Sequence, residues 1–182
     1  MQEIIDLDQL RFPIGKFTLP ENYSDENFSK WMTSMETLPD RLRAAVKNLD
    51  DAQLDTPYRP GGWTLRQVVH HLVDSHINSY CRFKLSLTEE VPVIRPYFEE
   101  RWAELGDAKS GPIEMSLKLL DALHARLVYF MKEMKAPDWE RKFFHPETNK
   151  EYQLKTILAI YAWHSEHHLN HILQLKKRSG WD

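Results

Sequence analysis

Four long segments with the hydrophobic periodicity of α-helices constrain the fold of this chain more than any other feature. They cover about residues 25–49, 65–88, 112–134 and 154–178. Helix signals bound them, such as the capping-box residues Thr64 and Gln67 at the start of the second segment and Gly180 after the fourth. Pro39 lies inside the first segment and predicts a kink or a break there. With little strand pattern between them, the segments predict an all-α fold, an antiparallel four-helix bundle.

The remaining sequence forms connections that are rich in proline and glycine. Residues 1–23 contain Pro13, Gly15 and Pro20, so we expect an extended N-terminal arm. The connections before the third and fourth segments are long, and long connections often carry binding residues. A chain of 182 residues can bury one sizeable core but not two, so we expect a single helical-bundle domain over residues 1–182.

Composition argues against several classes of function. The net charge is −3 and no basic stripe is present, so neither nucleic acid nor an anionic membrane is an expected partner. No segment approaches the roughly 20 apolar residues that cross a bilayer, and the first ten residues carry acids where a secretory signal would carry bases. Cys81 is the only cysteine, which excludes an intrachain disulfide. We therefore expect a cytoplasmic protein.

Histidine is the residue type that points to chemistry, because four of the nine histidines lie between positions 164 and 171. Residues four apart lie about 6 Å from each other on one helix face, close enough to share a metal ion. His164 and His168 form one such pair and lie on the same apolar stripe as Ile157 and Tyr161. The alternative pair is His167 with His171, but His167 lies off that stripe and His171 at its margin. Periodicity therefore favours His164 and His168 as metal ligands, with a hydrogen-bonded core pair as the alternative.

The second helical segment offers candidates for a third ligand. His70 points away from the other polar residues, and His76 points into the apolar face, as a core histidine would. His71 lies on a polar stripe, whose other members are Thr64, Gln67, Ser75, Asn78 and Arg82. This stripe either faces water or lines a wet internal cleft, and periodicity leaves both interpretations open. Ser75, Asn78 and Arg82 are candidate substrate-binding residues in the second interpretation, with Arg82 suited to a carboxylate.

Several stretches resemble the YfiT-like family of metal-dependent hydrolases, within the wider DinB-like superfamily of four-helix-bundle metalloproteins. The similar stretches are PIG at 13–15, the sequence from Asp55 to Glu90, IRPY at 94–97, HPET at 145–148 and WHSEHHLNHI at 163–172. In that superfamily, a histidine that precedes leucine on the second helix joins an H-x-x-x-H pair on the last. The resemblance thus implies His71, His164 and His168 as the ligands of one divalent metal ion, and it also implies a homodimer. Zinc is the ion we expect, with nickel as an alternative.

Two reactions on a small-molecule substrate fit a site with three histidines and open metal positions. One is hydrolysis, in which a metal-bound water attacks an acyl or related centre. The other is thiol transfer, in which a small thiol such as bacillithiol binds as the thiolate and attacks a small electrophile. The resemblance extends to both, because relatives are regarded as hydrolases while some DinB-like proteins are thiol S-transferases. A non-catalytic metal-binding or structural four-helix-bundle protein is the alternative to an enzyme.

Overall fold

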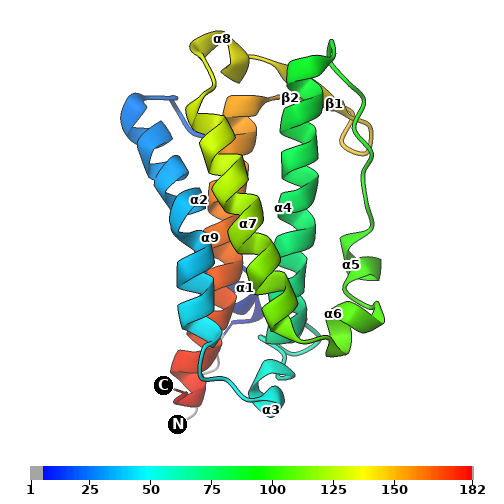
Figure 1. Cartoon of the computed structure of the whole chain (residues 1–182). Helices are drawn as coiled ribbons and strands as arrows, with labels where there is room; N and C mark the ends of the chain where they lie inside the picture. The colour runs from blue at the N-terminus through cyan, green and yellow to red at the C-terminus, as the bar shows by residue number, and fades with distance from the viewer. Residues whose placement is uncertain (1–5, 182) are drawn as a thin grey trace.

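Four long helices form the body of the molecule in a computed structural model, which describes residues 6–181 (Figure 1). They are α2 (Asp25–Val46), α4 (Leu65–Thr88), α7 (Ile113–Lys132) and α9 (Leu154–Ser179). Each helix packs against two others, in the order α2, α7, α4, α9 and back to α2. The expected four-helix bundle is confirmed.

The expected antiparallel arrangement holds for only two of the four pairs of neighbouring helices. Neighbours α2 and α9 run parallel, as do α4 and α7, whereas α2 with α7 and α4 with α9 are antiparallel (Figure 1). In a parallel pair, the residue numbers of both helices rise from one contact to the next. Between α2 and α9, Ser34 contacts Glu166 and Ala45 contacts Lys176. Between α4 and α7, His70 contacts Ser116 and His76 contacts His124. Because α4 and α7 run in the same direction, the chain between them must travel the full length of the bundle, which explains the long connection over residues 89–112.

Helix ends follow the capping residues seen in the sequence. At the start of α4, the Thr64 hydroxyl accepts from the Gln67 backbone N–H at 3.2 Å, and the Gln67 side chain accepts from the Thr64 N–H at 2.9 Å. At the end of α9, Gly180 adopts the left-handed conformation with φ of 66°, which glycine takes without a steric penalty. The capping box and the glycine stop are both confirmed.

Pro39 does not split α2, which continues without interruption from Asp25 to Val46. A proline has no N–H, so the carbonyl of Met35, four residues earlier, lacks its usual helical partner. The Nδ1–H of His124 on α7 donates to this carbonyl at 2.6 Å. The expected break is therefore wrong, and a neighbouring helix supplies the hydrogen bond that the proline removes.

The N-terminal arm is not extended throughout, as we had expected of residues 1–23. Leu7–Arg11 form a short helix, α1, because Asp6 caps it by accepting from the Asp8 N–H at 3.0 Å. The part of this expectation that concerns residues 1–5 lies outside the described residues. Beyond α1 the arm runs along α9, where the Gln174 side chain donates to the carbonyl of Pro13.

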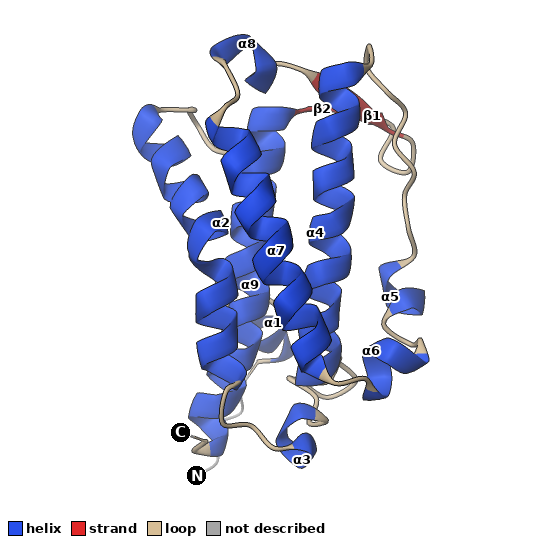
Figure 2. Cartoon of the chain, viewed as in Figure 1, coloured by secondary structure: helices blue, strands red, loops and turns tan. Residues whose placement is uncertain are grey.

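Short elements occupy the connections (Figure 2). They are α3 (Asp51–Leu54), α5 (Glu99–Trp102), α6 (Gly106–Ser110), α8 (Ala136–Trp139), and the strands β1 (Lys142–His145) and β2 (Lys150–Gln153). The strands form an antiparallel hairpin in which Phe143 pairs with Tyr152, and Asn149 in the turn has a positive φ of 53°. The sequence pattern missed this hairpin, since strands of four residues are too short to establish an alternation.

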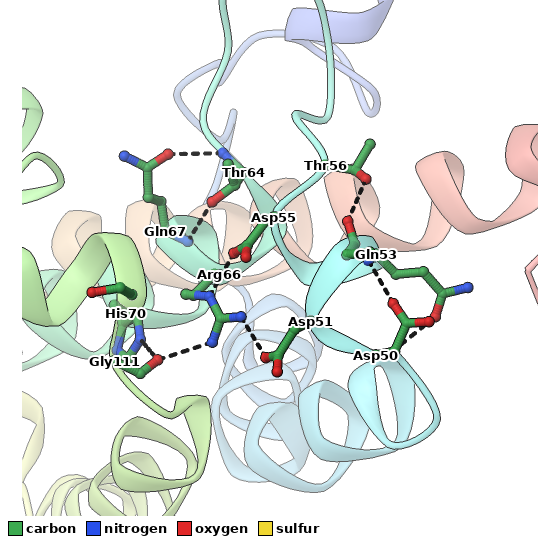
Figure 3. A network of polar contacts seen from close by, with 12 residues as sticks. Asp50, Asp51, Gln53, Asp55, Thr56, Thr64, Arg66, Gln67, His70 and Gly111 are labelled. Carbon is green, nitrogen blue, oxygen red and sulfur yellow. Dashed lines mark hydrogen bonds and ion pairs between the residues drawn. The ribbon is translucent and has the colours of Figure 1, made fainter.

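A network of charged and polar groups holds the start of α4 (Figure 3). The guanidinium of Arg66, only 5% exposed as a residue, donates to Asp55 at 2.6 Å and to Asp51 at 2.7 Å. It also donates to the carbonyl of Gly111, which accepts from His70 Nε2 as well. These bonds tie α3, α4 and the segment before α7 together, and thereby set the position of the next residue, His71.

The apolar faces of the four helices form two hydrophobic clusters, one around Leu38, Leu72 and Ile172 and the other around Phe83, Leu127 and Leu158. Among the described residues, none of the helices combines the length and the hydropathy that crossing a membrane requires.

Candidate metal centre

Three histidines from two helices converge at one point of the bundle. His71 on α4 meets His164 and His168 on α9, and each offers a ring nitrogen within 4.8 Å of the other two. The Nε2 atoms of His71 and His164 are 3.2 Å apart, and the ring centroids of His164 and His168 are 4.5 Å apart. Helical spacing places His164 and His168 on one face of α9, and α4 packs against that face. The structure therefore brings together the three residues expected from the sequence.

Burial keeps these three side chains neutral. Burial and, to a smaller extent, the neighbouring His167 lower the pKa of His71 from its ordinary value of 6.5 to about 4. Burial also holds the pKa values of His164 and His168 well below that value, and the other histidines of the cluster add to the effect. A neutral imidazole has one nitrogen lone pair, which is the form that binds a metal ion. The donor set therefore fits one zinc or nickel ion.

An aromatic wall limits how the ligand rings can turn. The indole of Trp63 lies with its centroid 4.6 Å from that of His71, and it is nearly parallel to the ring of His168 at 6.3 Å. Trp63 immediately precedes the Thr64 cap, so the capping box positions both the tryptophan and the first turn of α4. The tryptophan also lines the cleft described below.

A second cluster shares one residue with the first. His167, His168 and His171 also offer nitrogens within 4.8 Å of one another. His167 lies off the apolar stripe of α9, yet it is buried, because its ring stacks on Trp163 at 4.5 Å and lies 6.0 Å from Phe12 of the arm. The arm thus covers a face of α9 that periodicity alone places outside the apolar stripe.

Two further histidines form a buried pair across α4 and α7. Because His124 donates from Nδ1 to the Met35 carbonyl, its Nε2 accepts from His76 Nδ1 at 2.8 Å. The expectation of His76 as a core histidine bonded to a neighbouring helix is confirmed. The other nitrogen of His76 and the Nδ1 of His164 are buried without a partner among the described residues, and the two rings lie 5.7 Å apart.

The three histidines line a cleft of about 890 Å³. The polar stripe of α4 opens into this cleft, with Gln67, Ser75 and Arg82 among its lining residues. Gln67 and Ser75 are only 6% exposed, so the stripe faces an internal cleft rather than bulk water. Asn78 is an exception: its side chain donates to the carbonyl of Asp74 on its own helix, and it is not among the residues that line the cleft.

Arg82 is a half-buried cation in the same cleft. Its guanidinium donates to the hydroxyl of Tyr161 at 3.0 Å and has no carboxylate within 4.0 Å among the residues that the structure describes. Burial raises the pKa of Tyr161, so this hydroxyl stays protonated and cannot neutralise the arginine. His145, at the end of β1, also lines the cleft. The cleft therefore offers an anion a positive group that has no carboxylate at ion-pair distance among the described residues.

Other residues that line the cleft belong to the connections between the helices, and helical periodicity does not predict where a connection lies. Tyr97 and Glu104 belong to the segment between α4 and α7, and the Glu104 carboxylate accepts from the Gln67 amide at 3.3 Å. Arg11 and Arg59 enter from the arm and from the loop before α4. The length of the 89–112 connection was the available signal for Tyr97 and Glu104. Carboxylates thus line the cleft, although none was evident beside the ligands in the sequence.

Glu166 lies between the ligands in sequence but takes no part in the cluster. Its carboxylate accepts from both terminal nitrogens of Arg41, at 2.9 and 2.6 Å, and from the Ser34 hydroxyl at 2.6 Å. These partners are on α2, on a different side of α9 from His71. Glu166 thus points away from the ligand pair.

Comparison with known proteins identifies a family and relatives that are similar to most of this chain. The sequence profile of the DinB superfamily matches residues 34–172. Proteins named "Putative metal-dependent hydrolase" from Bacillus cereus strain B4264 and Bacillus thuringiensis subsp. konkukian strain 97-27 are each 51% identical over 175 residues. The match covers 96% of this chain and 100% of each relative.

Two solved structures share the fold. YfiT from Bacillus subtilis, described as a probable metal-dependent hydrolase with an unusual four-helix bundle topology, superposes with a TM-score of 0.93 at 49% identity. That alignment covers 96% of this chain and 99% of YfiT. The four-helix bundle protein TT2238 has a TM-score of 0.52 at 23% identity, over 81% of this chain and 95% of its own, which is a likeness of fold alone.

Proposed function

The chain belongs to the DinB superfamily, and we propose that it is a metal-dependent hydrolase whose small substrate carries an anionic group. One observation carries this proposal: three neutral histidines converge in the same cleft as the uncompensated guanidinium of Arg82. The names of the relatives support hydrolysis as the reaction.

We assign the metal-binding and shielding roles in the site to four residues. His71, His164 and His168 would hold the ion, which we propose to be zinc, with nickel as the alternative. When bound, it would supply Lewis acidity and lower the pKa of a water molecule, since three imidazoles leave its charge undiminished. Trp63 shields the ligands from solvent on one side, and its ring limits where a substrate can lie.

Arg82 would bind the anionic end of the substrate. Its bond to Tyr161 leaves other N–H groups of the guanidinium free to donate to a carboxylate or a phosphate. Ser75 lies on the same face of α4 between His71 and Arg82 and lines the cleft, and we propose that it donates to the middle of a bound molecule. His71 and Arg82 lie about three helical turns apart along α4. Arg82 bonds to Tyr161, which is three residues before His164 on α9, so one small molecule can reach both the ligands and the guanidinium.

Thiol transfer has no observation on this chain in its favour. Glu104 and Glu147 line the cleft, so carboxylates that hydrolysis can use as a general base are present. A non-catalytic metal site remains the alternative to an enzyme, and turnover distinguishes the two.

The test compares two small esters that differ in one group, a carboxylate in one and a carboxamide in the other. We expect the zinc-loaded protein to hydrolyse the carboxylate ester with the higher kcat/KM. Because a hydrogen bond to a charged group contributes about 1.5–3 kcal/mol, Arg82→Gln should lower kcat/KM for this ester about 10–100-fold and leave the carboxamide ester nearly unchanged. Arg126→Gln, an exposed change on α7 outside the cleft, serves as the control.

Equal losses on both esters would contradict the role of Arg82. A zinc-loaded protein that consumes a chlorobimane electrophile only when a small thiol is added, and hydrolyses neither ester, would replace hydrolysis with thiol transfer. A zinc-loaded protein inactive in both assays would favour the non-catalytic alternative.

A further inference from the structure

A chain of hydrogen bonds leads from the backbone of the arm to a metal ligand. The carbonyl oxygen of Arg11 can only accept, so the Nε2 of His171, 3.1 Å away, must donate its hydrogen to it. The ring of His171 is buried and has no carboxylate paired with it among the described residues, so it is neutral and carries its one proton on Nε2. The Nδ1 of His171 is then an acceptor.

The next bond in the chain follows from this. The Nδ1 of His171 faces the Nδ1 of His168 at 3.4 Å, and because the first cannot donate, the second must. A neutral His168 with its proton on Nδ1 has its lone pair on Nε2. The backbone of Arg11 thus determines, through two rings, which nitrogen of His168 can bind a metal ion.

We infer that His171 is a positioning residue, which holds His168 in the Nδ1–H form so that Nε2 is presented to the metal, with the Arg11 carbonyl holding His171 in turn. This inference rests on the proposed metal site of His71, His164 and His168. Histidine ligands in proteins usually donate their second ring nitrogen to a fixed acceptor, and loss of that acceptor typically weakens metal binding 10–100-fold.

The surroundings of His171 suit a fixed acceptor. Its ring stacks on Tyr58 with centroids 3.9 Å apart and planes 22° from parallel, and the residue is 2% exposed. Arg11 is itself held, because the arm is anchored one helical turn further along α9 by the bond from Gln174 to the Pro13 carbonyl. The affinity for the metal ion should therefore depend on the packing of residues 6–13 of the arm against α9, so these residues belong to the metal centre.

A second metal ion offers a competing explanation of the same geometry. His167, His168 and His171 could ligate an ion of their own, as their nitrogens lie within 4.8 Å of one another. The Nδ1 of His168 cannot both donate to His171 and bind a metal, so the two explanations exclude each other. They differ in the number of ions per chain and in whether the Nδ1 of His168 carries a proton.

The experiment measures zinc affinity and histidine tautomers in the full-length protein. His171→Phe keeps an aromatic ring against Tyr58 but removes the acceptor. His70→Phe is the control, because His70 is also buried but bonds to Ser116 and Gly111 instead of the cluster. Competition with a chromophoric chelator should show zinc binding weakened about 10–100-fold in His171→Phe and unchanged in His70→Phe. The same zinc titration should give one ion per chain for the wild type. The ¹⁵N spectra of the wild-type zinc protein with ¹⁵N-labelled histidine should show His171 protonated on Nε2 and His168 protonated on Nδ1.

The NMR measurement needs no variant, so it tests the inference even if His171→Phe does not fold. Unchanged zinc affinity in a folded His171→Phe variant would overturn the inference. So would two zinc ions per chain with the Nδ1 of His171 bound to metal. A wild-type protein that binds no zinc or nickel would overturn the proposed function as well, whereas one that binds a single ion with His168 coordinated through Nδ1 would overturn only this inference.

Discussion

Burial turns histidine from a titrating surface residue into a neutral ligand at this site. An exposed imidazole with its ordinary pKa of 6.5 is partly protonated near neutral pH, and a protonated ring cannot bind a metal. The bundle desolvates His71 and thereby lowers its pKa to about 4. Three such rings side by side would repel one another if charged, so each also helps to keep its neighbours neutral.

At the level of single residues, the sequence predicted the ligands on α9 but not their surroundings. The i,i+4 spacing of His164 and His168 within an apolar stripe is a local property, and local geometry in a helix is regular. His71 depended on family resemblance, because the same polar stripe would suit a solvent-facing helix. The burial of His167 by Phe12 could not be predicted, since it arises from residues more than 150 positions away in the sequence.

His124 provides a prediction about stability. His124→Leu removes the donor to the Met35 carbonyl and the acceptor for His76 Nδ1. Each buried group left without a partner costs about 1–3 kcal/mol, so we expect the free energy of unfolding to fall by at least about 2 kcal/mol in urea titrations. Tyr129→Leu on the same helix, at a position that is 71% exposed, should change it by less than about 0.5 kcal/mol. Equal effects of the two changes would show that the histidine pair does not stabilise the bundle.

At the level of elements, helix boundaries were predicted correctly where the capping residues are close to the helix end in the sequence. Thr64 with Gln67 and the stop at Gly180 are examples, because the partners are three residues apart or within one turn. Pro39 shows the opposite case. Whether a proline breaks a helix depends on what satisfies the freed carbonyl, and here His124 of a distant helix does so. The β1–β2 hairpin and the short helix α1 were missed because elements of four or five residues have little periodicity of their own.

The network at the start of α4 yields a prediction about two aspartates. Both accept from Arg66, but the Asp51 side chain is 88% exposed and that of Asp55 51% exposed. Water can replace the interaction of the more exposed acid, so Asp51→Ala should cost less than about 1 kcal/mol of unfolding free energy. Asp55→Ala leaves a buried guanidinium short of its closer partner and should cost about 1.5–3 kcal/mol. Chemical denaturation of both variants checks this, and a larger loss in Asp51→Ala would contradict the assignment.

At the level of the whole molecule, the site exists because of topology. The parallel arrangement of α4 and α7 forces the 89–112 connection along the outside of the bundle, and this connection contributes Tyr97 and Glu104 to the cleft. The arm closes another part of it with Arg11 and Phe12. Neither path follows from helical periodicity, so four helices and the ligand set could be predicted from the sequence while the cleft could not.

The buried histidines also make the metal-free protein sensitive to acid. His71 and His124 each have a pKa of about 4 when folded and an ordinary value of 6.5. The unfolded chain therefore binds more protons than the folded one between these values, and stability decreases as the pH falls from about 6.5 towards 4. Each histidine that is protonated in the unfolded chain and neutral in the folded one lowers the free energy of unfolding by up to about 1.4 kcal/mol per pH unit. Asp74, whose pKa burial raises to about 6, acts in the opposite direction but is a single group.

We accordingly expect the urea midpoint of the metal-free protein to be clearly lower at pH 5 than at pH 7, measured with a chelator present. His124→Leu should reduce this difference, because one of the groups responsible is gone. A midpoint that is unchanged or higher at pH 5 would contradict the burial of neutral histidines.

The metal content of the purified protein tests the central claim most directly. After expression with zinc and nickel supplied, elemental analysis should find one ion per chain in the wild type and in His167→Ala. His71→Ala and His164→Ala should contain none, while circular dichroism shows the bundle still helical. A wild-type protein free of metal, or equal metal content in His71→Ala and the wild type, would contradict the account.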